Sequence, residues 1–335
     1  MIEVTGVSKE FVSYKKYPGL KGTIKSLFTR EKVIKAAVRD VSFSIGKGEV
    51  VGYIGANGAG KSTTIKIMSG ILVPTTGHCK VAGLVPYENR RKNAKNIGVV
   101  FGQRTQLWWD LPLGETFQIL KEIYDVSDSD FKQRMVFLNE TLGLEDFMQS
   151  AVRTLSLGQR MRADLAASLL HNPPVLYLDE PTIGLDIVVK DKIRQAIRDI
   201  NSQYETVIVL TTHDLRDIEE LCSRIIIIDE GSIIYDGSLL DIKSRFGSEG
   251  IVGIEPKSRE SFKELSVEEH FQKADDSFTC TFEEGRATLV YDKNKLSSAD
   301  ILNFILQKTT VNDITISETG IEDIVKQIYN EGLQS

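Results

Sequence analysis

The sequence predicts an α/β layer fold followed by a small α+β domain. Strand and helix signals alternate from residue 1 to about residue 240, and such alternation is typical of one sheet covered by helices. A glycine-rich loop at residues 55–62 separates a strand signal from a helix signal. Beyond about residue 250 the signals follow the order β-α-β-β-α-β, which suits a ferredoxin-like module.

Short apolar runs, each bounded by polar or turn residues, predict the buried strands of the first domain. These strands are expected at residues 50–54, 175–178, 206–211 and 225–229. A helix is expected over residues 64–71, directly after the glycine-rich loop. The loop therefore joins the end of a strand to the start of a helix.

Strand signals disappear between Leu113 and Leu165, where apolar residues recur at helical spacing. These apolar residues are Phe117, Leu120 and Tyr124, then Phe131, Met135 and Leu138. A mostly helical subdomain at about residues 105–165 is therefore expected as an insertion into the sheet domain.

Glycines at position 237 and within residues 246–250 end the first pattern and predict a domain boundary. We expect the first domain to span residues 1–245 and the second to span residues 250–335. The elements expected in the second domain are a strand at 251–254, a helix at 260–273, a hairpin of 278–282 and 287–291 around Glu284-Gly285, a helix at 298–307, a strand at 311–316 and a final helix at 321–329.

The composition limits the expected partners of the protein and the redox environment in which it works. The formal net charge of the 335 residues is −6, so no nucleic acid is expected as a partner. The cysteines Cys79, Cys222 and Cys280 lie far apart and form no C-x-x-C pair, which fits a reducing cytosol. Residues 1–11 lack the pattern of a signal peptide, and the longest apolar runs have the length of strands. We therefore expect no membrane-spanning segment.

The glycine-rich loop at residues 55–62 reads GANGAGKS and matches the phosphate-loop pattern G-x-x-x-x-G-K-[ST]. Its backbone N–H groups can surround phosphates at a helix N-terminus, where the helix dipole favours an anion. Lys61 is expected to reach the β- and γ-phosphates, and the hydroxyl of Ser62 to bind Mg²⁺. The predicted nucleotide ligands in this region are Gly55, Asn57, Gly58, Gly60, Lys61, Ser62 and Thr63.

Polar side chains follow two other predicted strands, at the edge where open α/β sheets bind ligands. Asp179 and Glu180 follow the run 175–178, and adjacent side chains on a strand point apart. Asp179 is expected to hold Mg²⁺, and Glu180 to polarise the water that attacks the γ-phosphate. His213 follows the strand at 206–211 and could donate to the γ-phosphate.

A second polar turn, residues 155–160 with the sequence LSLGQR, stands about twenty residues before Asp179. The hydroxyl of Ser156 and the amide of Gly158 would precede a helix whose positive end faces an anion. We call this segment the signature turn.

Together, these motifs in this order resemble the nucleotide-binding domain of ATP-binding cassette (ABC) transporters over residues 1 to about 240. The resemblance implies a P-loop NTPase fold with a RecA-like core, an antiparallel β part and an inserted helical subdomain. It also implies that Gln103 contacts Mg²⁺ or the attacking water, and that His213 is the switch histidine. In the family, the signature turn binds the γ-phosphate of ATP held by the opposite subunit.

The resemblance assigns the remaining nucleotide contacts. Ser156, Gly158 and Gln159 would contact the partner's nucleotide, and Asp186 would cross the dimer interface. Where the family usually has glycine, this chain has Leu157, which tolerates a positive φ poorly. Phe11 is the expected adenine contact and Tyr14 the alternative, although either ring could instead cap the sheet.

Two segments are candidate contacts with a membrane or a partner. Residues 15–35 are rich in lysine and contain Ile24, Leu27 and Phe28 at helical spacing. This insertion could be an amphipathic helix near lipid headgroups or a permease, or simply a solvated segment. The resemblance places the coupling helix of a permease beside Trp108 and Trp109, which could anchor it, although at least one of them is expected in the subdomain core.

The resemblance thus implies an ATPase subunit that forms a head-to-tail homodimer, or pairs with a paralogous subunit, around ATP and Mg²⁺. Residues 101–112 and 155–162 most resemble the ATPases of ABC-2 type exporters, which act with a separate membrane permease on the cytoplasmic face of the cell membrane. The basic insertion also fits an envelope polysaccharide or teichoic-acid exporter. A DNA-repair or translation ABC ATPase is disfavoured, because the interval from Ser62 to Leu155 is short and poor in heptads and the chain has one cassette.

Overall fold

The computed structural model describes residues 1–14, 32–101, 105–247, 249–318 and 320–331. The chain divides into two compact units, Met1–Gly237 and Ser238–Ser335. Each unit has its own hydrophobic core. The division lies at the first of the two glycine positions that punctuate the sequence, so the helix that follows Gly237 belongs to the second unit.

The main sheet of the first unit has the strand order β5-β6-β7-β3-β8-β9. The pairs from β5 to β8 are parallel. Strand β7 is buried at all of its residues, as expected when helices cover both faces of a parallel sheet. The strands are β3 (Val50–Gly55), β5 (Ile97–Phe101), β6 (Val175–Asp179), β7 (Val207–Thr211), β8 (Arg224–Asp229) and β9 (Ser232–Ser238).

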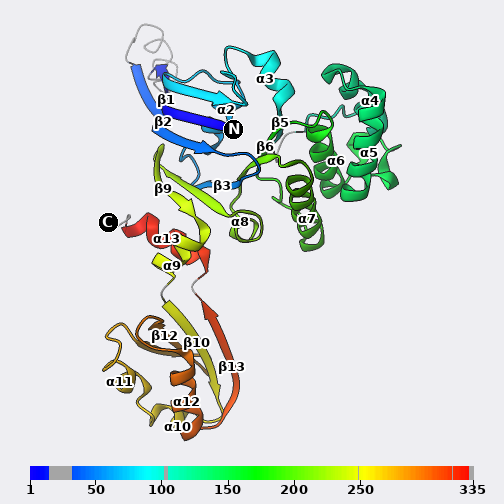
Figure 1. Cartoon of the computed structure of the whole chain (residues 1–335). Helices are drawn as coiled ribbons and strands as arrows, with labels where there is room; N and C mark the ends of the chain where they lie inside the picture. Colours follow the sequence, from blue (N-terminus) through cyan, green and yellow to red (C-terminus); the bar gives the residue numbers. More distant parts are fainter. Residues whose placement is uncertain (15–31, 102–104, 248, 319, 332–335) are drawn as a thin grey trace, which may run out of the picture. The chain divides into compact units, whose positions relative to one another are not determined.

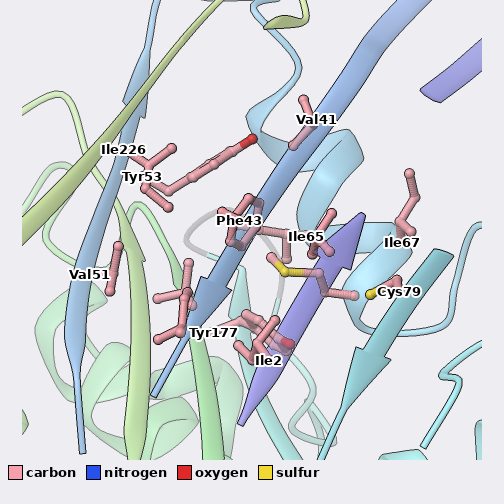
Figure 2. Packing of buried hydrophobic residues seen from close by; sticks show 14 of the residues in the cluster. Ile2, Val41, Phe43, Val51, Tyr53, Ile65, Ile67, Cys79, Tyr177 and Ile226 are labelled. Carbon is pink, nitrogen blue, oxygen red and sulfur yellow. The ribbon is translucent and has the colours of Figure 1, made fainter. Parts of the chain in front are cut away.

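A second, antiparallel sheet has the order β2-β1-β4 and packs its apolar face on the same core. Its strands are β1 (Ile2–Tyr14), β2 (Lys32–Ile45) and β4 (Thr76–Val81). Figure 2 shows Ile2 and Phe43 from this sheet beside Tyr53 and Tyr177 from the parallel sheet, with Ile65 of helix α2 among them. The core thereby fixes the helix that follows the phosphate loop against both sheets.

Helices connect the strands of the first unit, and three of them form an insertion between β5 and β6 (Figure 1). The inserted helices are α4 (Leu113–Tyr124), α5 (Asp128–Leu142) and α6 (Leu157–Leu169), with 3₁₀ turns at Glu145–Phe147 and Val152–Thr154. The remaining helices are α2 (Lys61–Met68), α3 (Arg90–Asn96), α7 (Ile187–Tyr204) and α8 (Leu215–Leu221). The predicted helical insertion is therefore present.

One expected helix boundary in this unit was wrong. The helix expected at residues 64–71 begins at Lys61, inside the phosphate loop, and ends at Met68. It ends early because Gly70 has a φ of 80°, a left-handed conformation that stops an α-helix.

The second unit contains a sheet of order β11-β12-β10-β13 in which all pairs are antiparallel. This order and the intervening helices give the predicted ferredoxin-like topology. Outside it, α9 (Leu239–Phe246) packs against α13 (Ile321–Glu331). The other elements are β10 (Glu249–Pro256), α10 (Arg259–Lys263), α11 (Val267–Phe271), β11 (Thr279–Glu283), β12 (Arg286–Asp292), α12 (Ser298–Lys308) and β13 (Val311–Glu318).

The single helix expected at residues 260–273 is in fact two short helices, α10 and α11. Ser266 lies between them with a φ of 45°, which breaks the helix. The break allows Phe262, Val267 and Phe271 all to be buried in the core of the module. The hairpin between β11 and β12 turns at Glu284 and Gly285 as expected, both with positive φ.

No helix within the described ranges combines the length and the apolar character that a bilayer crossing requires. The expectation for residues 15–31 of the basic insertion lies outside the described residues, which resume at Lys32 in β2.

Candidate functional site

A cavity of about 1010 Å³ opens at the carboxyl edge of the parallel sheet, in front of the phosphate loop. Strand β3 ends at Gly55 and β6 ends at Asp179, with β7 and Thr211 between them. Because these strands are parallel, their carboxyl ends meet at one edge. The predicted site residues that line the cavity are Phe11, Asn57, Gly58, Gly60, Lys61, Ser62, Thr63, Asp179, Glu180 and His213.

The phosphate loop holds Lys61 in a buried position against its own backbone. The Lys61 ammonium donates to the carbonyl oxygens of Gly55 and Ala56, at 2.5 and 3.1 Å. Burial lowers the pKa of Lys61 below its ordinary value, although the charges of Glu180 and Asp179 act in the opposite direction. Carbonyl oxygens thus hold the ammonium group at the N-terminus of α2, where a phosphate would attract it.

Gly60 makes the sharp turn into α2 possible. Its φ is 113°, and a Cβ atom there would lie 2.5 Å from the carbonyl oxygen of Ala37. No side chain fits this gap without moving the β2 backbone. Only glycine therefore allows the loop to lie this close to the antiparallel sheet.

Asp179 and Ser62 place two oxygen donors side by side. Thr211 Oγ1 donates to Asp179 Oδ1 at 2.5 Å, and Ser62 Oγ lies 3.4 Å from Asp179 Oδ2. A hydroxyl and a carboxylate are ligands that Mg²⁺ accepts when it also binds phosphate oxygens and water. The oxygen atoms present therefore fit a magnesium ion bound together with a nucleotide.

Glu180 and His213 form a pair beside these groups. His213 Nε2 lies 3.0 Å from Glu180 Oε1, and the two side chains are 48% and 20% exposed. Burial raises the pKa of Glu180 above its ordinary value, although His213 and Lys61 act in the opposite direction. Glu180 has a φ of 60°, which is uncommon for a residue other than glycine. The backbone thus turns sharply directly after Asp179.

The signature turn is a regular helix start. Ser156 is the N-cap of α6, and its Oγ accepts from the amide of Gln159, whose side chain accepts in return from the amide of Ser156. Leu157 is the first helical residue, and its φ is not positive. The turn is therefore not distorted at Leu157, because the capping box needs an ordinary helical residue there.

The signature turn packs against the segment around Asp186. A Cβ atom on Gly158 would lie 3.0 Å from Val189, and one on Gly184 would lie 3.3 Å from Leu157. Asp186 is the N-cap of α7 and accepts from the amide of Val189 at 2.9 Å. Four predicted residues, Ser156, Gly158, Gln159 and Asp186, thus lie together but do not line the cavity.

The structure separates the two candidate base contacts. Phe11 lines the cavity and is 42% exposed, whereas Tyr14 is 56% exposed and does not line it. Both rings lie on β1. Of the two, Phe11 is therefore the one placed to stack on a base.

Both tryptophans lie at the surface, so the expectation that at least one fills the subdomain core was wrong. Trp108 is 39% exposed and Trp109 is 51% exposed. The Arg160 guanidinium lies over the Trp109 ring, 5.5 Å from its centroid. Gln103, which precedes this segment, lies outside the described residues.

Three residues near the site were missed from the sequence. Lys35 on β2 and Lys66 on α2 line the cavity. Lys66 lies one helical turn after Ser62, so helical spacing could have suggested it, whereas only the pairing of β1 with β2 places Lys35 beside Phe11. Both bring positive charge to a cavity suited to phosphates.

Asp164 is the third residue and belongs to α6. Its Oδ1 accepts from Thr105 Oγ1 at 2.9 Å and from the amide of Gln106 at 3.1 Å. The side chain is 6% exposed. Burial raises the pKa of Asp164 to about 6, although these hydrogen bonds lower it. Asp164 thereby fastens the chain after Gln103 to the helix that begins at the signature turn.

Comparison with known proteins matches residues 38–183 to the family model "ABC transporter". The ABC transporter ATP-binding protein NatA of Bacillus subtilis (strain 168) is 35% identical over 63% of this chain and 85% of its own length. The linearmycin resistance ATP-binding protein LnrL of the same organism is 35% identical over 65% of this chain and 70% of its own length. The methionine import ATP-binding protein MetN, also of this organism, is 36% identical over 62% of this chain and 61% of its own length.

A solved structure described as the dimeric post-hydrolysis state of the ATP-binding cassette MJ0796, bound to ADP and Pi, superposes with a TM-score of 0.59. It is 27% identical and covers 71% of this chain and 99% of its own. The matched part thus has the size of one complete cassette.

The Asp164→Asn variant tests the burial of this carboxyl group. A folded-state pKa above the ordinary value means that stability is present below the ordinary pKa and is lost as the pH rises through about 6. Asparagine keeps the Oδ1 acceptor but does not ionise. The free energy of unfolding of wild type minus that of the variant should therefore fall by roughly 2 kcal/mol between pH 4 and pH 7.

Urea unfolding of both proteins at several pH values measures this difference. A difference that rises with pH, or stays flat, contradicts the assignment of a raised pKa to Asp164.

Proposed function

Because the chain belongs to the ABC transporter family, we propose that it is the ATP-hydrolysing subunit that powers export through a separate permease of the ABC-2 type. The observation that carries this proposal is the convergence of the phosphate loop, Asp179, Glu180 and His213 on one cavity at the sheet edge. These groups supply phosphate binding, a metal ligand, a base and a second polar contact at one place.

ATP would bind with its phosphates at the N-terminus of α2. The amides of the phosphate loop and the Lys61 ammonium would compensate the phosphate charge, and Lys61 would exchange its carbonyl partners for phosphate oxygens. Phe11 would stack on the adenine ring. Ser62 and Asp179 would hold Mg²⁺, and the family resemblance adds Gln103 to them. The ion would screen the charge of the phosphates.

Glu180 would accept a proton from the attacking water. Its raised pKa improves it as a base, because proton affinity rises with pKa. His213, 3.0 Å away, would hold the carboxylate in place and donate to the γ-phosphate as charge develops there.

The signature turn would complete the site of a second subunit. Ser156, Gly158 and Gln159 lie at the N-terminus of α6, and Asp186 lies at the N-terminus of α7, outside the cavity of their own chain. Beside them Ile187 and Val188, 70% and 66% exposed, form an apolar surface that a partner subunit would cover. A head-to-tail homodimer would bury this surface and bring each signature turn to the other subunit's nucleotide.

Export is the favoured direction of transport. Support comes from the sequence around residues 101–112 and 155–162, and from the relative LnrL, whose name describes resistance to linearmycin. The relative MetN is named as an importer, so import is the second candidate. The subunit would act on the cytoplasmic face of the cell membrane, with Trp108 and Trp109 against the permease. An envelope polysaccharide or teichoic-acid exporter is the alternative substrate class.

The Glu180→Gln variant tests the base. We expect kcat for ATP hydrolysis to fall at least about 100-fold, because general-base catalysis contributes a factor of this order. The affinity for ATP should change little, because glutamine keeps the size of the side chain. Phosphate release and equilibrium binding of labelled ATP measure the two quantities. The exposed Glu88→Gln variant is the control for loss of one charge, and wild-type turnover in Glu180→Gln would exclude Glu180 as the base.

The Ser156→Ala variant tests the contact in trans. Ser156 and Ser127 both cap a helix and accept from an amide three residues ahead, so alanine at either position should cost about 1 kcal/mol of stability. Only Ser156→Ala should lower kcat, by roughly 10-fold, because only this hydroxyl would meet a phosphate. Steady-state ATPase and thermal unfolding assays compare the two variants.

Mixing subunits distinguishes a contact in trans from one in cis. A head-to-tail dimer of one Lys61→Met subunit and one Ser156→Ala subunit has both changes in one site and an intact second site. The mixture should therefore exceed the activity of either variant alone. No gain on mixing, with heterodimers present, would place Ser156 in the site of its own chain.

The Trp109→Ala variant tests the permease contact. The tagged chain, purified from native membranes in mild detergent, should carry a protein with several transmembrane helices. Trp109→Ala should lower its recovery by about 10-fold or more, as expected for an aromatic hot spot. Ile123→Ala, which removes another exposed apolar side chain from the helical insertion, is the matched control. Equal recovery with all three proteins would show that Trp109 is not part of the contact.

A further inference from the structure

A buried ion pair lies behind the Glu180–His213 pair. Arg194 of α7 donates through Nε to Asp217 Oδ1 of α8 at 2.7 Å. Arg194 is 2% exposed and Asp217 is 0% exposed. Two charges removed from water in this way cost several kcal/mol each unless hydrogen bonds satisfy them. The pair therefore needs further hydrogen bonds to compensate for its burial.

The second oxygen of Asp217 joins two loops of the site. Its Oδ2 accepts from Thr182 Oγ1 at 2.5 Å and from Thr212 Oγ1 at 3.0 Å. Thr182 and Thr212 are 2% and 4% exposed. Thr182 follows Glu180 by two residues, and Thr212 directly precedes His213. One carboxylate oxygen thus receives a hydroxyl from each of the two turns that carry the reacting pair.

These turns need such a tether. Glu180 has a φ of 60°, a strained conformation that persists only when surrounding contacts hold it. One backbone hydrogen bond, from the amide of Glu180 to the carbonyl of Thr211 at 2.9 Å, joins the turns directly. The side chains of Glu180 and His213 are partly exposed, so packing alone does not fix them.

Arg194 keeps the Asp217 carboxylate in position from the other side. Burial lowers the pKa of Arg194, but the hydrogen bond to Asp217 and the nearby acidic groups outweigh burial and raise its pKa above the ordinary value. Its Nη1 also contacts Asp191 and Glu220, at 3.0 and 3.3 Å. The guanidinium is thus held by α7 and α8 together, and with it the carboxylate that accepts from both threonines.

We propose that Asp217, held by Arg194, is a positioning residue for ATP hydrolysis: through Thr182 and Thr212 it fixes the separation of Glu180 and His213. This inference rests on the proposed function, because it assigns a purpose to the geometry of that pair. It concerns the rate of the chemical step, since none of Arg194, Thr182, Thr212 and Asp217 lines the nucleotide cavity.

Valine substitutions test the tether without changing side-chain size. Thr182→Val and Thr212→Val each remove one hydroxyl from Asp217 Oδ2. Each should lower kcat about 10-fold or more and leave KM for ATP within about twofold, because small displacements of reacting groups act on the rate. The kcat of the double variant should fall by less than the product of the two single-variant decreases, since both threonines position the same pair of side chains. Thr182→Ser and Thr212→Ser restore the hydroxyl and should recover most of kcat.

Thr116→Val is the matched control. Thr116 is fully buried in α4, and its hydroxyl has no hydrogen-bond partner among the described residues. This variant should keep the wild-type kcat. Thermal unfolding of every variant verifies folding.

Wild-type kcat in folded Thr182→Val and Thr212→Val proteins overturns the inference. So does a rise in KM with unchanged kcat, which would assign the tether to binding. Failure of the proposed function gives a different result, because wild-type protein would then lack ATPase activity and Glu180→Gln would change nothing.

Discussion

The parallel arrangement of β3, β7 and β6 is the constraint on which the site depends. It brings Gly55, Thr211 and Asp179 to one edge of the sheet, although they lie far apart in the chain. The hydrogen bond from Thr211 to Asp179 joins two of these strand ends directly. The phosphate loop, Glu180 and His213 each begin within a few residues of one of these ends. A change in strand order would scatter them.

At this edge of the sheet, the charge of Lys61 is compensated by backbone carbonyl oxygens and nearby carboxyl groups rather than by one direct ion pair. Lys61 is buried beside two carboxyl groups and contacts backbone carbonyl oxygens. Burial raises the pKa of Glu180 and lowers that of Lys61, so both shifts oppose the charged forms. The phosphates of a nucleotide would compensate the positive charge of Lys61, and a bound metal ion would compensate the negative charge of the carboxyl groups. The site is thus suited to a ligand that carries both phosphate and a divalent cation.

The signature turn belongs to a rigid piece of the helical insertion. Asp164 and Arg160 of α6 hold the segment at residues 105–112 through hydrogen bonds and a contact with Trp109. Further backbone hydrogen bonds join Leu111 to Val152 and Trp109 to Arg153. A force on the exposed tryptophans would therefore move the signature turn with them. This connection would give a physical route between the proposed permease contact and the proposed contact in trans.

The sequence by itself determined where the phosphate loop lies, that Asp179, Glu180 and His213 follow buried strands, and that a helix starts near Ser156. These motifs depend on contiguous residues with fixed local geometry. It also determined the ferredoxin-like order of the second unit, since alternating apolar residues and the Glu284-Gly285 turn are local signals. Only the tertiary structure decided that Lys35 lines the cavity, that both tryptophans are exposed and that Asp217 joins Thr182 to Thr212. These features depend on strand pairing and helix packing between distant segments, and no local pattern encodes the distance between two side chains that meet only when the sheet is formed.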